Sequence, residues 1–187
     1  MRVMVTIDHP WSQSFNHAIL ARVVETLRAG GHEVDVLNLH QENFDPVLRV
    51  NELAVYTEGR YLDPKVGAYQ KRIEQAQHLI YIFPVWWEVM PALLKGFFDK
   101  VFLPDWAFTE ADATPLLTHI TGATVITTMG APQVIHTAVE AVLCRGILGF
   151  CGIQHYKWFN LVDVANVLPE QRAAFLDEIE TYMRELT

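Results

Sequence analysis

FPVWWEVMPALLKGFFDKVF, residues 83–102, is the stretch that decides the fold class of this 187-residue chain. An apolar run ends here at Pro84, two adjacent tryptophans follow, and Pro91 then opens an amphipathic helix. Loops between a buried strand and its helix are normally polar, because they lie on the surface. Trp86 and Trp87 therefore indicate a loop that covers a flat, apolar ligand, or else two rings that close the top of the core or lie in a subunit contact.

Segments with strand-like and helix-like patterns alternate on both sides of this stretch. Strands are predicted at Arg2–Ile7, Glu33–Leu39, His78–Phe83, Ala123–Thr128 and Gln154–Val162. Helices are predicted at Ser14–Ala29, Lys65–Gln77 and Val134–Leu148, after Pro91 and from Pro169 onward, with a long, partly helical connection before Asp63. Strands that alternate with helices predict an α/β fold whose parallel sheet is covered on both faces. We expect one domain over residues 1–187.

The composition is that of an acidic globular protein. Hydrophobic residues make up 51% of the chain, charged residues 19%, and the formal net charge is −8. This charge argues against nucleic acid and anionic membranes as partners, since both need clustered Lys and Arg. No run approaches the ~20 apolar residues of a membrane span, and the N-terminus does not resemble a signal peptide. The cytoplasm is therefore the expected location.

Neither the cysteines nor the histidines have the spacing of a metal site. Cys144 and Cys151 are the only two cysteines, and we interpret them as structural thiols in a reducing compartment. The eight histidines are scattered without HxH or HExxH spacing, so no metal is expected.

Three loops are expected to meet at one edge of the sheet. Ligands of open parallel sheets bind beyond the C-terminal ends of the strands, which selects Asp8–Asn16, Pro84–Met90 and Met129–Gln133. The first loop, DHPWSQSFN, leads directly into a helix. A helix N-terminus offers unpaired N–H groups and a positive dipole end to a phosphate, and further donors are available from His9, Ser12, Ser14 and Asn16. The alternative interpretation is ordinary N-capping by Ser14.

Four motifs in this order carry a resemblance to a known family. They are HPWSQSFN (9–16), NFDPVL (43–48), the 83–102 block continued to DWAFT (105–109), and TTMG (127–130). The chain resembles the NAD(P)H:quinone oxidoreductases of the flavodoxin-like fold, which include relatives of DT-diaphorase, bacterial modulators of drug activity and ancillary oxidoreductases of potassium-efflux systems. The similarity covers roughly the first 130 residues and is most specific in the third-strand block.

This resemblance implies a fold, a cofactor and a reaction. The implied sheet has five strands in the order 2-1-3-4-5. The implied cofactor is a flavin, FMN or alternatively FAD, with NADH or NADPH as electron donor. Hydride would pass by a two-electron ping-pong route through the flavin to a quinone or a similar flat acceptor. The family also implies a homodimer, with the region of Tyr56 and Tyr61 at its interface.

The resemblance also assigns roles to residues at matching positions. The flavin phosphate would be held by His9, Ser14, Phe15 and Asn16. The backbone and ring edge beside the isoalloxazine would come from Pro84, Val85, Trp86 and Trp87. The loop at its pyrimidine end would be formed by Thr127, Thr128, Met129 and Gly130.

Two departures from the family pattern keep other functions open. Met129 stands where the family usually has a glycine, which permits close backbone approach or a positive φ. The residues that assist hydride transfer in the mammalian enzymes have no clear counterpart, and His136 is a weak candidate for that role. The alternatives are a flavin-binding electron carrier and a regulatory subunit that acts through a transport channel.

Overall fold

Five parallel strands form one sheet in the order β2-β1-β3-β4-β5 in the computed structural model, which describes residues 1–130 and 138–186. The strands are β1 (Arg2–Ile7), β2 (Glu33–Asn38), β3 (His78–Pro84), β4 (Gly122–Thr128) and β5 (Tyr156–Leu161). The predicted sheet and its strand order are therefore confirmed. β1 has the predicted bounds, and the ends of the other four strands differ from the predicted ones by at most two residues, most at β5.

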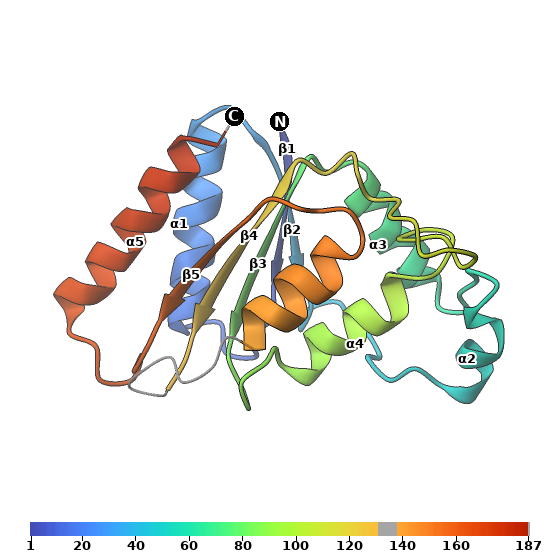
Figure 1. Ribbon diagram of the computed structural model, residues 1–187. Helices are drawn as coiled ribbons and strands as arrows, with labels where there is room; N and C mark the ends of the chain where they lie inside the picture. The colour runs from blue at the N-terminus through green and yellow to red at the C-terminus, as the bar shows by residue number, and fades with distance from the viewer. Residues whose placement is uncertain (131–137, 187) are drawn as a thin grey trace.

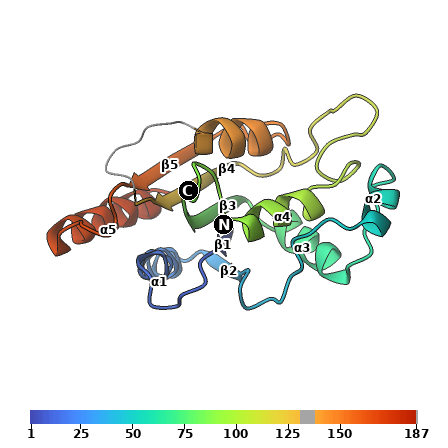
Figure 2. The same ribbon diagram turned by 90° about the horizontal axis from the view of Figure 1, so that it is seen from below.

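Helices cover both faces of this sheet (Figures 1 and 2). One face carries α1 (Phe15–Ala29) and α5 (Pro169–Arg184), and the other carries α3 (Pro64–Glu74), α4 (Ala92–Val101) and η1 (Glu140–Gly149), while the short α2 (Val50–Tyr56) lies beyond the sheet. Side chains of a strand alternate between the two faces. Val3 and Val5 thus join the α1–α5 core, and Met4 joins the α3–α4 core.

Capping chemistry explains where the helices begin and end. The Ser14 side chain accepts from the His17 N–H and is the N-cap, so α1 begins one residue later than predicted. Asp63 caps α3 in the same way and Pro64 occupies its first position, which suits a residue without an N–H. The predicted glycine stop of α1 is confirmed, with Gly30 as its C-cap.

The helix predicted at Val134–Leu148 begins within residues 131–137, which lie outside the described residues. Its described part begins with two α-helical residues, 138–139, and continues as η1, which is wound as a π-helix and ends at Gly149. Cys144 and Cys151, within η1 and just after it, are both buried free thiols. No helix in the described part of the chain is long and apolar enough to cross a bilayer.

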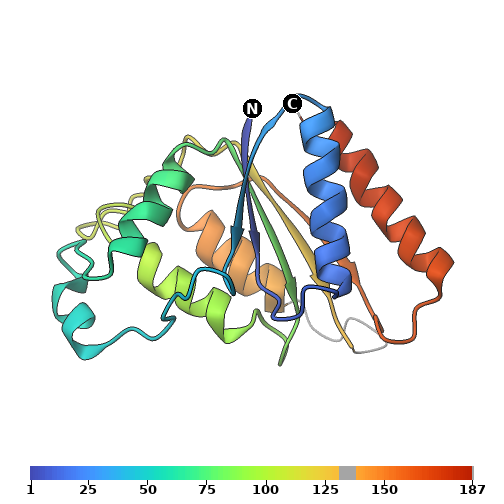
Figure 3. The same ribbon diagram turned by 180° about the vertical axis from the view of Figure 1, so that it is seen from behind.

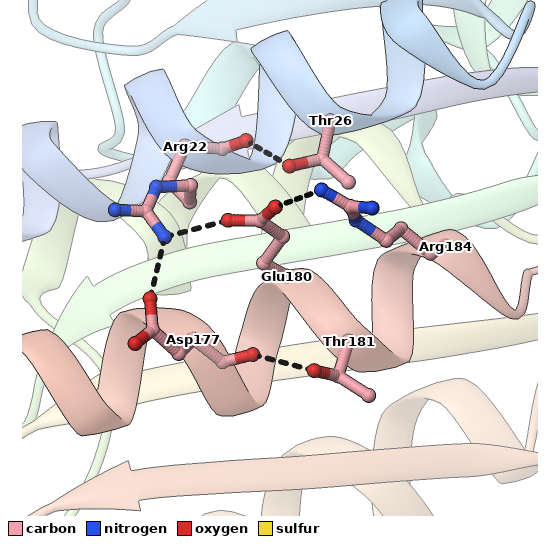
Figure 4. Close-up of polar contacts among 6 residues, drawn as sticks. All are labelled: Arg22, Thr26, Asp177, Glu180, Thr181 and Arg184. Atoms are coloured by element: carbon pink, nitrogen blue, oxygen red, sulfur yellow. Dashed lines mark hydrogen bonds and ion pairs between the residues drawn. The ribbon is translucent and has the colours of Figure 1, made fainter.

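Charged side chains join α1 to α5, which lie side by side in Figure 3 and in the close-up of Figure 4. Arg22 of α1 lies 2.9 Å from Asp177 and 2.6 Å from Glu180 on α5. Glu180 also pairs with Arg184, one turn further along α5. Partly exposed pairs of this kind contribute little stability each, but together they orient two helices whose first turns lie at the same edge of the sheet (Figure 1).

The NFDPVL segment (43–48) between β2 and α3 packs across α4 and is held there by contacts of Lys100 and Gly96. The Lys100 side chain of α4 is only 3% exposed. Its ammonium group lies 2.8 Å from a carboxylate oxygen of Glu52 and donates to the Asp45 carbonyl at 3.0 Å. The Pro46 backbone lies directly on Gly96, where an added Cβ would be 2.2 Å from the Pro46 carbonyl oxygen. This packing supports the helix that follows the tryptophan pair.

Candidate functional site

A cavity of about 720 Å³ opens at the edge where the strands end. Its lining comes from the first and second predicted loops and from the described residues of the third, Met129 and Gly130. The strands end at the lower edge of the sheet in Figure 1. Its lining residues are His9, Trp11, Ser14, Phe15, Asn16, Pro84, Val85, Trp86, Trp87, Thr128, Met129, Gly130, Val164 and Arg172. All residues predicted for the cofactor site except Thr127 therefore surround one cavity, and their binding roles remain predictions.

The first loop presents the start of α1 to this cavity. Ser14 is the N-cap, and its hydroxyl also lies 3.1 Å from Nδ1 of His17. Phe15 and Asn16 are the first two helical residues, whose N–H groups have no partner within an α-helix. Capping by Ser14 and exposure of these donors coexist, so the capping interpretation does not exclude an anion site. Ser12 is exposed and does not line the cavity.

His9 is a neutral donor in this loop. Its Nδ1 accepts the Trp11 N–H at 3.1 Å, so the neutral ring carries its proton on Nε2. Burial lowers the pKa of His9, and the neighbouring His17 lowers it further. The two imidazole rings meet edge to face, with centroids 6.2 Å apart. Near neutral pH, His9 thus offers a hydrogen bond rather than a full charge.

Asn16 links α1 to the end of β4. Its Oδ1 accepts from the Thr128 hydroxyl at 2.8 Å, and both side chains are buried. Its Nδ2 is buried and has no hydrogen-bond partner among the described residues. A buried amide without a partner is costly unless a ligand or water satisfies it. The amide of Asn16 therefore marks a position where the cavity requires an acceptor.

We expect Thr128→Val to lower the free energy of unfolding by about 1–2 kcal/mol, because it leaves the second polar atom of Asn16 unpaired as well. Thr128→Ser keeps the hydroxyl and is the matched control. Chemical denaturation of the three proteins measures the difference. Equal stability of the valine and serine variants would show that the hydroxyl contributes nothing.

The tryptophan pair forms a tight, strained turn. The Trp86 N–H donates to the Val89 carbonyl at 3.0 Å and the Val89 N–H donates back to Trp86 at 3.2 Å. The two central residues, Trp87 and Glu88, have φ values of 49° and 69°. Non-glycine residues in this left-handed region cost about 1–3 kcal/mol each and gather at functional sites. The indole of Trp87 is 98% exposed and that of Trp86 48%, so neither closes the core.

Thr127 is the predicted site residue that the cavity excludes. It is buried, and its hydroxyl donates to Asn160 Oδ1 at 2.8 Å and accepts from Trp158 Nε1 at 2.9 Å. These contacts direct its side chain toward Asn160 and Trp158 of β5. Neighbouring residues of a strand point to opposite faces of the sheet, so Thr127 and Thr128 do not both face the cavity. Met129 follows without a positive φ, and its N–H donates to the Leu161 carbonyl.

Three lining residues were not predicted from the sequence: Trp11, Val164 and Arg172. Arg172 lies in the first turn of α5, with its guanidinium 5.6 Å from the centre of the Phe15 ring. One terminal nitrogen donates to the Val164 carbonyl at 2.8 Å, while Nε is buried and has no partner among the described residues. The positively charged guanidinium of Arg172 therefore lies at the cavity, next to the start of α1.

Other sequence predictions fall away from the cavity. His136 lies outside the described residues. Tyr56 is half-buried against the α3–α4 core. Tyr61 is exposed, with its hydroxyl over the backbone of Gly67.

Comparison with known proteins gives the family. The model of the flavodoxin-like fold family matches residues 1–186. NAD(P)H dehydrogenase [quinone] 1 of Rattus norvegicus is 30% identical over 203 residues, covering 94% of this chain and 74% of that enzyme. This chain belongs to the NAD(P)H:quinone oxidoreductase family of the flavodoxin-like fold.

Two further NAD(P)H:quinone oxidoreductases support this membership. The enzyme of Cavia porcellus is 32% identical, covering 94% of this chain and 73% of its own length. The solved structure of the NAD(P)H:quinone oxidoreductase from Methanothermobacter marburgensis superposes with a TM-score of 0.88 at 26% identity, covering 99% of this chain and 96% of that one. The predicted family is confirmed, and the match extends past Gly130 to residue 186.

Proposed function

We propose that this protein is a flavin-dependent oxidoreductase that transfers two electrons from NADH or NADPH to a quinone or a similar flat acceptor. The observation that carries the proposal is one cavity at the strand ends, with an anion-binding end and an aromatic rim. Family membership supports the same activity. We propose FMN as the flavin, with FAD as the alternative.

The anion-binding end suits a flavin phosphate. The first N–H groups of α1, the neutral His9 and the guanidinium of Arg172 supply donors there. Helix N-termini and arginine are the usual protein partners of phosphate. The unpaired Nδ2 of Asn16 and Nε of Arg172 would gain acceptors on binding. The residues present therefore fit the group.

The remaining walls suit a flat ring. Pro84 and Val85 continue β3 into the cavity, and Trp86, Trp87 and Met129 add large apolar side chains. Aromatic and thioether side chains pack well against a planar ring system. When bound, the flavin supplies the hydride chemistry. Pro84, Val85, Trp86, Trp87 and Met129 would hold its ring, and no nucleophilic side chain is required.

The proposal is tested by the visible spectrum of the purified protein. We expect a yellow protein that NADH or NADPH bleaches without oxygen and that a benzoquinone recolours, at rates that give ping-pong kinetics. Extraction of the pigment identifies FMN or FAD. Slow bleaching by pyridine nucleotide with no quinone turnover would favour an electron carrier or a regulatory subunit of a transport system. A colourless protein that takes up no flavin would overturn the proposal.

We expect Trp87→Ala to lower kcat/KM for the quinone about twofold to tenfold, because aromatic stacking contributes about 0.5–1.5 kcal/mol. Trp87→Phe keeps a stacking ring and is the matched control. Steady-state kinetics with NADPH at saturation measures the effect. An unchanged kcat/KM for the alanine variant would remove Trp87 from the acceptor site.

We also propose a homodimer located in the cytoplasm, as the resemblance implies. Size-exclusion chromatography with light scattering measures the oligomeric state, and a monomer at micromolar concentration would contradict the first part.

A further inference from the structure

Asp8 is a buried carboxylate whose charge interacts with that of His9, a residue that lines the cavity. It follows β1, precedes His9, and is 1% exposed. One carboxylate oxygen lies 2.8 Å from Nε2 of His40, just beyond β2, and the other accepts the Leu94 N–H of α4 at 2.8 Å. The Asp8 N–H donates to the Ile82 carbonyl of β3. Through its side chain and its backbone, this single residue thus contacts three segments that are distant from it in sequence.

By accepting the Leu94 N–H, Asp8 supplies the side-chain cap that α4 lacks within its own sequence. Pro91 occupies the N-cap position of this helix and makes no side-chain cap hydrogen bond. Asp8 satisfies a first-turn N–H instead, 86 residues away in sequence. Because α4 directly follows the turn at Trp86 and Trp87, Asp8 fixes the phosphate-binding loop relative to the aromatic rim.

The charges around Asp8 come from histidines. Among the described residues, His40 faces Asp8 from the end of β2 and His9 from its own loop, while α4 contributes the Leu94 N–H. His17 on α1 lies next to His9. Burial raises the pKa of Asp8, opposed by the hydrogen bonds from Leu94 and His40. His40 is about one-third exposed, so one side of the pair faces solvent.

We propose that Asp8 and His40 form a positioning pair that sets the charge at the anion-binding end, so that a phosphate bound there is held more tightly when the pair carries an additional proton. An unprotonated pair leaves one buried negative charge that acts on His9 at the cavity, whereas a protonated pair is neutral. Charges act strongly on each other where water is excluded. This inference rests on the proposed flavin-binding function.

Two substitutions separate the charge of the pair from its hydrogen bonds. His40→Gln keeps an N–H donor for Asp8 but has no charged form. Asp8→Asn keeps an acceptor for the Leu94 N–H and removes the negative charge. Flavin-free protein is titrated with FMN and with riboflavin, which lacks the phosphate, at about pH 6 and about pH 8.5, on either side of the range in which histidine usually changes charge.

The expected effects on the two variants have opposite signs. His40→Gln binds FMN about threefold to tenfold more weakly than the parent at the lower pH and equally at the higher pH. Asp8→Asn binds FMN about threefold to tenfold more tightly than the parent at the higher pH. Riboflavin affinity is the same for all three proteins. Calorimetry in two buffers also shows fewer protons taken up with FMN by His40→Gln than by the parent.

A merely structural pair gives a different result and overturns the inference: both variants then lose affinity for FMN and riboflavin alike, at both pH values. The matched control is Arg72→Gln, which breaks the half-buried bidentate pair of Arg72 with Asp35 on α3 and β2. It leaves both affinities unchanged. If Asp8→Asn folds poorly, the pH profile of His40→Gln decides. A parent protein that binds neither flavin overturns the proposed function too, whereas normal binding with no effect of His40→Gln overturns this inference alone.

Discussion

Arg172→Gln is expected to weaken FMN binding about tenfold to a hundredfold, because a hydrogen bond to a charged group contributes about 1.5–3 kcal/mol. Arg172 lines the cavity beside Phe15, the first residue of α1. Its buried Nε has no partner among the described residues, so the guanidinium has a donor available to a phosphate. Glutamine loses the charge and the fork of donors that suits phosphate oxygens.

Comparison with riboflavin decides whether Arg172 acts on the phosphate. The loss should be confined largely to FMN, since riboflavin has no phosphate. Arg184→Gln is the matched control: it lies on the same helix, pairs with Glu180 at the surface and does not line the cavity. An equal loss for FMN and riboflavin would instead mean that Arg172 only supports the packing of Phe15 and Val164.

Gly96→Ala is expected to lower the free energy of unfolding by about 2–3 kcal/mol, because overpacking a rigid contact costs that much. A Cβ at this position would lie 2.2 Å from the Pro46 carbonyl oxygen and 2.4 Å from the Pro46 Cβ. The backbone of the NFDPVL segment must therefore move. Inside a helix, alanine is normally about 1 kcal/mol more favourable than glycine, so a loss of stability cannot come from helix propensity.

Lys95→Ala is the control for this helix, because Lys95 is half-exposed and pairs with Asp99 only at the surface. Its stability should stay close to that of the parent. Urea denaturation followed by far-UV circular dichroism measures all three proteins. A Gly96→Ala variant as stable as the parent would show that the segment over α4 shifts without cost.

The fold could be predicted from the sequence because its signals are local. The apolar runs and the helix-capping residues Ser14 and Gly30 lie within or beside the elements that they define. The rule that ligands bind at strand ends selected three loops, and described residues of all three line the cavity. Thr127 was predicted for the same site, but it does not line the cavity, because strand alternation separates its side chain from that of Thr128.

Other parts of the site depend on packing between distant segments. Arg172 reaches the cavity only because α5 lies against α1. No sequence motif near Pro169 indicates a contact with phosphate. The pairing of Asp8 with His40 and Leu94 likewise spans 32 and 86 residues. The strained turn at Trp87 could not be predicted, because tryptophan gives no signal for a positive φ.

Because the residues of the cavity are far apart in sequence, the cavity can be completed only late in the synthesis and folding of the chain. Asn16 meets Thr128 across 112 residues, and Arg172 contacts Phe15 from the last helix. Contacts between distant segments form late, since long loops must close first. A ribosome-bound chain shorter than about residue 172 therefore lacks a complete cavity wall. Cofactor loading should follow translation, and its rate should depend on how quickly α5 docks.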